Sequence, residues 1–505
     1  MASPRVACVA PLLLTGCSLI YNPNNLPDPR LIDAAVVDAN PCALVIDDVA
    51  PKIIDEGQGA GGSVPALVVV HGNNIVNANL KIALKAKNGS TVHLSPVTDA
   101  VASFDHTYAA FTVIADVDGQ LGTAGPVNVP LDITVSQDAP ADGGCMSSAT
   151  FTLSGKLALQ GLPELTGKTS IAALDDKYSK VDLATASFDG AMPAVVRAVS
   201  SIHIAGAHAD ASSTVAGPGG NTGTARPGTC PAASGGGDTG KDANLSAVIA
   251  NGGGGGGGGA STAGLPGATG SSGRGGIGGA GGIKNGNDAM PTLDGNAACA
   301  GGGGGLGGTL ILTNPGGAGG GGGGTLVLSA GGDISVATIT AVGGMGVQPA
   351  SGGGGGGGGA GGNVLIHSDM GTLAITGAID VSGGTGGSPG GGDGARGRVR
   401  WDAPVGAAPG GTSHRGPSFA PLASRVFTTA SPDLMIKGSS GDGFAGRTID
   451  AAGQAHDLGH VSVNTGVAVV TATLQPGFNR VCITLDGGAQ EHAEADTCVD
   501  VAFLP

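Results

Sequence analysis

The distribution of glycine constrains this chain more than any other feature of its sequence. Its 505 residues include 101 glycines, and most of them lie between Gly206 and Gly411, far above the share of roughly 7% in ordinary proteins. Glycine loses the most conformational entropy on folding and has no side chain to bury. We therefore expect a framework of strands to hold any ordered part of this region.

Strand patterns of the required kind occur between the glycines. Apolar residues alternate with other residues in two segments. Counterpart positions in the two segments lie about 38 to 40 residues apart, which indicates an internal repeat. An earlier copy surrounds Val195, Ile202 and Ile204, and a truncated last copy ends at Trp401. The pattern predicts a glycine-rich parallel β-solenoid over residues 165–402, whose coils bury one apolar face as a ladder. The counterparts are Leu326, Leu328, Ile334, Val336, Ile339 and Ala341, then Val364, Ile366, Leu373, Ile375, Ile379 and Val381.

Polyglycine forms the second part of this region. It fills residues 252–259, 301–305, 319–324 and 352–359, and glycine also recurs at every third residue from Gly264 to Gly282. A three-residue period fits an extended threefold helix. Two outcomes stay open for these loops and for the insert at 213–308: a bundle of glycine helices joined by backbone hydrogen bonds, or disorder. A disulfide between Cys230 and Cys299 would favour order by about 4 kcal/mol.

Both flanks of the solenoid predict small antiparallel β-sheets. Seven short strand patterns lie within residues 43–155, and six more lie within residues 429–505. Short strands at this spacing are typical of immunoglobulin-like β-sandwiches. Residues 403–428 are rich in proline and glycine and are expected to form a linker. The whole chain is thus expected to be all-β, with its modules in a line and the last sandwich presented outward.

The first residues carry an export signal. Arg5 precedes an apolar run that is too short to span a bilayer. The sequence Leu14-Thr15-Gly16-Cys17 then resembles the lipobox of bacterial lipoproteins, which implies a signal peptide at 1–16 and a lipidated Cys17. Ser18 in the next position implies the outer membrane, and residues 17–42 are expected to form a spacer. We expect this lipid to anchor the protein in the outer membrane. Display on the cell surface is favoured over the periplasmic face.

Six further cysteines are expected to form disulfides, because an even number in an exported chain indicates oxidation. Their order along the chain suggests one bridge for each module. The pairs are Cys42 with Cys145, Cys230 with Cys299, and Cys482 with Cys498.

Two short segments carry resemblances to known modules. Residues 56–59 and 68–74, with Val70 leading into a Gly-Asn turn, resemble immunoglobulin-like TIG modules of surface proteins. Residues 474–481 resemble the turn before a late strand in bacterial immunoglobulin-like modules. The whole pattern resembles glycine-rich outer-membrane lipoproteins of myxobacteria and, more distantly, glycine-rich surface proteins of mycobacteria. This resemblance rests on architecture and composition, and most such proteins lack an assigned activity.

Composition limits the possible functions. The net charge is −15, with 12% charged and 3% aromatic residues, which argues against nucleic acid as a partner. We expect a non-catalytic lipoprotein that binds a glycan or matrix ligand, without a cofactor or metal. One alternative is a polysaccharide lyase or hydrolase on the solenoid, but its outward positions offer only isolated candidates such as His367 and Asp380. A second is a protein that binds ice or another crystalline surface through flat glycine helices.

Several motifs match functional signatures by spacing alone. His456 and His460 are four residues apart, which suits zinc only on a helix, so a pair of surface histidines is the better interpretation. Residues 386–390 match a nucleophile elbow, but Pro389 and the glycines after it cannot start the helix that an elbow requires.

Overall fold

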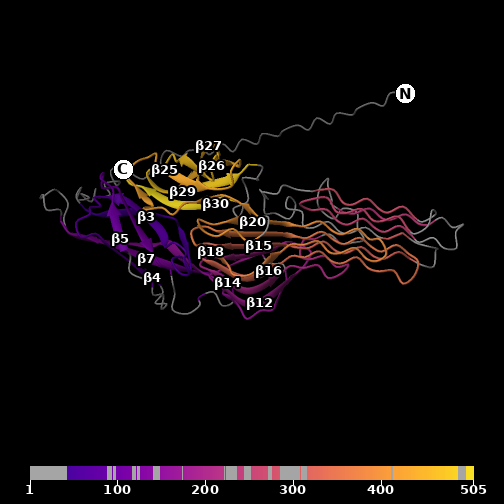
Figure 1. Cartoon of the computed structure of the whole chain (residues 1–505). Coiled ribbons are helices and arrows are strands. Elements are labelled where there is room, and N and C mark those ends of the chain that lie inside the picture. The colour runs from indigo at the N-terminus through magenta and orange to yellow at the C-terminus, as the bar shows by residue number, and fades with distance from the viewer. Residues whose placement is uncertain are drawn as a thin grey trace, which may run out of the picture.

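The structure, a computed structural model, describes residues 43–87, 94, 98–115, 121, 125–139, 148–172, 175–220, 222, 236–243, 252–270, 276–284, 307–308, 315–410, 413–486 and 496–505. Over these residues the chain is all-β, as predicted, and its strands β1 to β30 form six sheets. In the described residues we find no helix long and apolar enough to cross a membrane. Figure 1 shows antiparallel sheets at both ends of the chain and parallel sheets between them.

The N-terminal module consists of two four-stranded sheets that share one core. Alternating apolar residues from both sheets meet there, including Val68, Phe111, Ile133 and Leu159, all almost fully buried. One sheet has the order β1 (Val45–Ala50), β3 (Ala66–Asn73), β6 (Tyr108–Val113) and β5 (Thr98–Ala102). The other has the order β2 (Ile53–Asp55), β8 (Ala149–Gly161), β7 (Val127–Gln137) and β4 (Lys81–Ala86).

The middle module contains two sheets in which every strand pair is parallel, and the chain passes from one sheet to the other along most of its course. The first sheet contains β9 (Leu165–Thr166), β10 (Ser170–Ala172), β12 (Val181–Asp189), β14 (Ile202–His208), β16 (Ile334–Thr340), β18 (Thr372–Ile375), β19 (Ile379–Asp380) and β21 (Val405–Gly406). The second contains β11 (Asp175–Tyr178), β13 (Ala194–Ala198), β15 (Thr325–Ala330), β17 (Asn363–Ser368), β20 (Arg398–Asp402) and β22 (His414–Arg415).

Parallel pairing joins the residues that the repeat pattern identified as counterparts. Leu326 is opposite Val364, and Ile334 is opposite Leu373. The apolar residues of both sheets face one shared core, which contains Leu328, Val336 and Ile366. Ile375 was expected to be inward as well, but it is only partly buried and packs against the edge of this core.

Described glycine segments form an ordered array beyond one end of the parallel sheets (Figure 1). Residues 252–260 occupy its middle, and their N–H groups point in three directions at a three-residue period. Gly255 and Gly258 donate to the carbonyls of Gly355 and Gly358, while Gly256 and Gly257 donate to Asp238 and Leu265. This pattern is that of packed threefold helices, so order is the outcome in these residues.

Close backbone approach explains why the inner positions of this array are glycine. A Cβ added to Gly256 would lie 1.9 Å from the carbonyl oxygen of Ala280, and one added to Gly257 would lie 1.9 Å from that of Asp393. Larger residues occur where the array faces solvent, as at Leu265 and Ile277, which are both exposed. Glycine is therefore required at these close approaches, whereas Ala260, Ala360 and Ala395 are buried together at inner positions that accept a methyl group.

The C-terminal module also contains two sheets. The smaller sheet has the order β23 (Ser418–Phe419), β25 (Asp433–Lys437) and β28 (Val467–Thr471). The larger sheet has the order β24 (Val426–Phe427), β30 (Asp496–Phe503), β29 (Gly477–Leu485), β26 (Gly443–Asp450) and β27 (Ala455–Ser462). The expected linker at 403–428 contains four two-residue strands: β21 and β22 extend the parallel sheets, while β23 and β24 join the last module.

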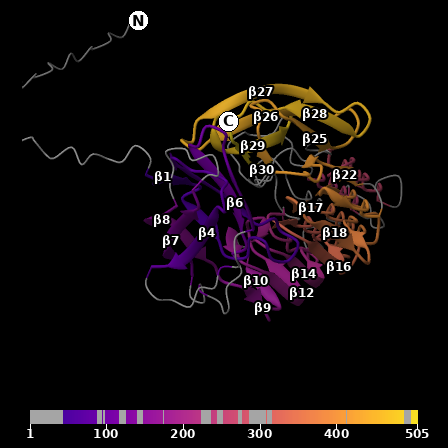
Figure 2. The ribbon, with the colours of Figure 1, turned by 90° about the vertical axis from the view of Figure 1, so that its left-hand side faces the viewer.

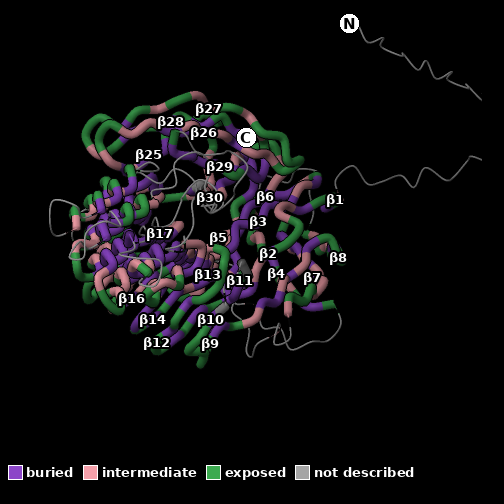
Figure 3. The backbone as a smooth tube through the Cα atoms, turned by 90° about the vertical axis from the view of Figure 1, so that its right-hand side faces the viewer, coloured by how far each residue is buried: buried purple, intermediate pink, exposed green. Residues whose placement is uncertain are grey.

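The expected linear arrangement of the modules is wrong. Phe478 and Leu504 of the last module pack against Leu67 and Val69 of the first, in one buried apolar cluster. In Figure 2 the C-terminal strands lie over both the N-terminal module and the parallel sheets. Figure 3 shows buried residues along the surfaces where the modules face one another. Apolar burial therefore folds the two ends of the chain together.

The parallel ladder can be tested by substituting two adjacent residues of β16. Ile339 is fully buried and Thr338 is exposed, so Ile339→Asp places an uncompensated charge in the core and should destabilise the module by several kcal/mol, about 3 or more. Thr338→Asp should change the unfolding free energy by about 0.5 kcal/mol at most. Urea unfolding measures both; similar, small effects would contradict a packed ladder.

The glycine array can be tested by adding one methyl group. Gly256→Ala should force the backbone of residues 252–260 away from Ala280 and speed amide exchange throughout the array, because the added carbon overlaps a carbonyl oxygen. Gly410→Ala is the control, since nothing lies within 4 Å of its added Cβ. Hydrogen exchange followed by mass spectrometry compares the two variants. Unchanged exchange in Gly256→Ala would contradict the packed array.

Candidate functional site

A cavity of about 440 Å³ lies where the three modules meet. Its size falls in the range of small-ligand sites, about 300–1,000 Å³. Each module supplies part of its wall. The N-terminal module contributes Asp55, Gln58, Ser63, Val64 and Pro65; the middle module contributes Lys177, Arg197, Ala198, Val199, Ser329, Gly331, His367, Asp369 and Met370; the C-terminal segment contributes Arg425, Arg480, Cys498, Val499 and Asp500.

Parallel register builds one wall of the cavity. On the outward face of the second parallel sheet, polar residues follow one another from strand to strand: Lys177 of β11 is opposite Arg197 of β13, which is opposite Ser329 of β15. Ser329 is in turn opposite His367 of β17. Adjacent strands lie about 4.8 Å apart, so these side chains form a continuous polar row. The expectation that His367 is isolated is therefore wrong.

His367 is a buried member of this row, and both of its ring nitrogens have carboxylate partners. Nε2 lies 3.0 Å from Asp369 Oδ1, and Nδ1 lies 3.2 Å from Asp402 Oδ2. Burial alone would lower the pKa of His367, but the two carboxylates raise it from 6.5 to about 9. The imidazole is thus protonated at neutral pH and donates to both partners.

A buried guanidinium completes this network. Arg400 donates from Nε to Asp402 Oδ1 at 2.9 Å and from Nη2 to Oδ2 at 2.7 Å. Burial would raise the pKa of Asp402, but the charge of Arg400 and the hydrogen bond from His367 hold it below its ordinary value. Asp402 therefore stays ionised and fixes the orientation of His367.

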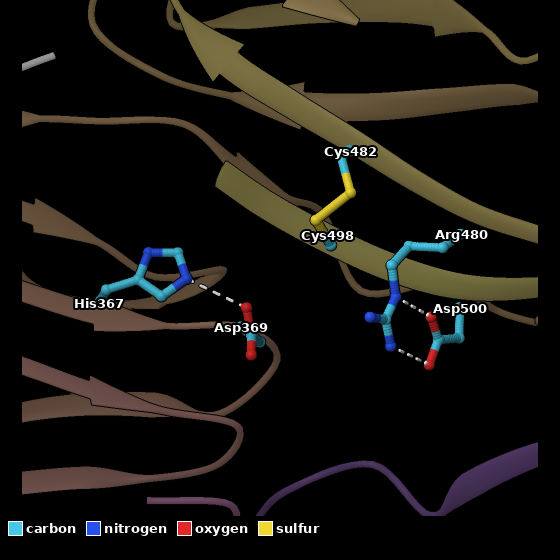
Figure 4. The surroundings of a disulfide bond; sticks show 6 residues. All are labelled: His367, Asp369, Arg480, Cys482, Cys498 and Asp500. Carbon is cyan, nitrogen blue, oxygen red and sulfur yellow. Dashed lines mark hydrogen bonds and ion pairs between the residues drawn. A yellow bond between two sulfur atoms is a disulfide. The ribbon is translucent and has the colours of Figure 1, made fainter. Parts of the chain in front are cut away.

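The C-terminal module supplies a second charged wall. Arg480 of β29 and Asp500 of β30 are opposite each other, and the guanidinium binds the carboxylate through Nε at 2.7 Å and Nη2 at 3.1 Å. The Cys482–Cys498 disulfide joins the same two strands. Figure 4 shows Asp369 lying between the His367 ring and the Arg480–Asp500 pair. The pairing of Cys482 with Cys498 is the one predicted from the cysteine order.

Arg425 joins this wall to the N-terminal module. Its Nη2 donates to the carbonyl oxygen of Pro65 at 2.7 Å. Burial lowers the pKa of Arg425 below its ordinary value, opposed by the charge of Asp500. On the opposite side, Lys177 Nζ lies 2.6 Å from Asp55 Oδ2. Both contacts cross between modules, so the cavity walls hold the three modules together.

The charges of the cavity suit binding better than proton transfer. Each of its three carboxylates, on Asp55, Asp369 and Asp500, contacts a cationic side chain. Acid–base catalysis needs a group that can gain or lose a proton near the operating pH. All three carboxylates are already paired with cations, and the imidazole of His367 has both nitrogens engaged as donors.

Most of the predicted site residues lie outside the described part of the chain: Cys17, Cys42, Cys145, Cys230 and Cys299. Their lipidation and pairing stay predictions. Asp380 is exposed on β19, and its carboxylate accepts the backbone N–H of Ser382 rather than contributing to the cavity.

The two predicted surface histidines of the last module contact different carboxylates. His456 contacts Asp450, whereas His460 contacts Asp486. Both lie on β27, a strand rather than a helix. Over the described residues no group of histidine, cysteine and acidic side chains could hold a metal ion.

Comparison with known proteins finds no matching family model, no similar curated protein and no similar solved structure.

The pKa of His367 makes stability depend on pH. A folded-state pKa of about 9, above the ordinary 6.5, means that the protonated imidazole stabilises the fold. This contribution is complete below pH 6.5 and is lost as the pH rises through about 9, so the free energy of unfolding should fall across that window. His367→Gln should reduce the dependence of the unfolding free energy on pH in this window. Urea unfolding at several pH values measures the slope, and an NMR titration midpoint near 6.5 for His367 would contradict the assignment.

Proposed function

We propose that this chain is a non-catalytic lipoprotein of the outer membrane, anchored through Cys17 and displayed on the cell surface, with an adhesive or matrix-binding role. The observation that carries the binding role is the cavity between the three modules, two of whose cationic side chains cross from module to module: Lys177 pairs with Asp55, and Arg425 donates to the carbonyl oxygen of Pro65. Such a site is preorganised, which reduces the ordering that a ligand must impose when it binds.

The proposal includes a finer assignment of each module. The middle module is a parallel β-solenoid, supported by the strand-to-strand register of counterparts such as Leu326 and Val364. The first and last modules are immunoglobulin-like sandwiches, supported by paired antiparallel sheets around one core in each. Together they form a rigid support for the cavity rather than a row of separate domains.

A polysaccharide-active enzyme is the second candidate, and the cavity is also the observation that favours it. Carboxylates stand beside basic groups there, on the face of a parallel sheet. Glycoside hydrolysis needs one carboxyl group with a raised pKa to act as the acid. Asp369 and Asp500 are each in direct contact with a cationic side chain, which supports the binding role.

The lipid anchor is tested by Cys17→Ser. Acyl chains contribute about 0.8 kcal/mol per buried methylene, so their loss should leave an uncleaved precursor and remove the protein from the outer-membrane fraction. Ser18→Ala is the matched control and should fractionate as the parent does. Membrane fractionation with mass measurement of the mature N-terminus distinguishes the two. Normal outer-membrane levels of Cys17→Ser would show that lipid is not the anchor, and protease treatment of whole cells tests surface display.

A further inference from the structure

We infer that the cavity between the three modules binds an acidic saccharide, with a sugar carboxylate seated against the Arg425 guanidinium and Ser329. This inference rests on the proposed binding function and names the class of its ligand.

The concentration of positive charge in the cavity is unusual for this chain. The whole sequence has 23 lysines and arginines and a net charge of −15, yet Lys177, Arg197, Arg425 and Arg480 all line this one space. With protonated His367, five cationic side chains stand against three carboxylates there. A cavity lined by an excess of one sign attracts a ligand of the opposite sign. The ligand is therefore an anion.

Arg425 offers the most direct contact for that anion. Among the described residues, its guanidinium makes one hydrogen bond, to the carbonyl oxygen of Pro65. By contrast, Lys177 and Arg480 are each neutralised by direct contact with a carboxylate, on Asp55 and Asp500. A guanidinium binds a carboxylate through parallel N–H donors, and burial of Arg425 strengthens such a contact by excluding water.

Ser329 lies in the middle of the polar row, between Arg197 and His367 on neighbouring strands. Within the described part of the chain its hydroxyl has no hydrogen-bond partner, although the residue lines the cavity. A hydroxyl can both donate and accept. It can therefore serve a carboxylate oxygen or a sugar hydroxyl next to it.

The rest of the lining favours a sugar acid over inorganic phosphate. Asp369 and Asp500 repel a compact anion of higher charge, but their oxygens can accept hydrogen bonds from sugar hydroxyls. Val64, Pro65 and Met370 supply apolar surface for the C–H faces of a ring. A ligand with one carboxylate and several hydroxyls on each ring matches this mixture of cations, acceptors and apolar groups.

The test uses the purified full chain and isothermal titration with trigalacturonate. Its methyl ester is the neutral probe of the same shape, and inorganic phosphate is the second anion. We expect binding of the acid, with affinity at least about tenfold lower for the ester, because the carboxylate contact is lost. Equal affinity for acid and ester would overturn the inference. Phosphate binding without trigalacturonate binding would overturn the saccharide assignment.

Substitutions locate the site. Ser329→Asp adds a carboxylate between Arg197 and His367, which halves the excess of positive charge in the cavity without removing any contact that joins the modules, so affinity should fall by about tenfold or more. Ser329→Asn is the uncharged control of similar size, and its affinity for trigalacturonate should stay within about threefold of that of the parent. Arg396→Gln removes an exposed cation from the glycine array and should leave affinity unchanged. Unchanged affinity in Ser329→Asp would place the ligand elsewhere and overturn the inference.

Arg425→Gln provides a further variant, read together with its thermal unfolding because Arg425 also contacts Pro65. Arg425→Lys retains the charge and should recover part of the affinity that Arg425→Gln loses. Loss of folding in Arg425→Gln leaves the Ser329 variants to decide the result. Failure of all sugar binding together with normal outer-membrane fractionation would reject the ligand class while leaving the lipid anchor of the proposed function intact.

Discussion

Parallel pairing between the strands of the middle module is the interaction on which the rest of the structure depends. It places Leu328 against Ile366 on the inner face and Ser329 against His367 on the outer face. The same hydrogen-bond ladder thus builds an apolar core and a polar row at once, because successive side chains of a strand point to opposite faces. A one-residue shift in register would exchange the two faces. The cavity wall and the core are therefore fixed by a single constraint.

Backbone contact replaces side-chain contact in the glycine array. Residues 252–260 make hydrogen bonds with neighbours on several sides, and their inner positions have no room for a Cβ. Each bond adds only about 1 kcal/mol net, so such an array depends on many bonds formed together. The parallel sheets stabilise the array by fixing where its glycine segments begin and end. The segment at 341–362 lies between β16 and β17, which are held in register with β14 and β15.

Much of the fold could be predicted from local patterns, and the site could not. Alternating residues such as Leu326 and Val364 identified the repeat, because a ladder repeats its apolar positions at nearly constant spacing. The packing of Phe478 on Leu67 left no such signal, since single apolar residues on opposite modules have no period. The cavity joins residues from three modules for the same reason. One part did have a signal: Arg480 and Asp500 each lie two residues outside a cysteine of one pair, so an antiparallel Cys482–Cys498 bridge places them opposite each other.

The hydrogen bonds of the glycine array also determine the order in which the chain can fold. Gly258 donates to Gly358 and accepts from Ala395, so the middle of the array meets these two partners only after a long stretch of later sequence has been made. Contacts between residues so far apart slow folding, because closing a long loop precedes any gain from the bonds inside it. The array is therefore completed only when the last of its partners is present. A chain cut short before residue 390 would keep most of the hydrogen bonds of this segment but would lack Gly392 and Ala395, whose N–H groups donate to Gly255 and Gly258.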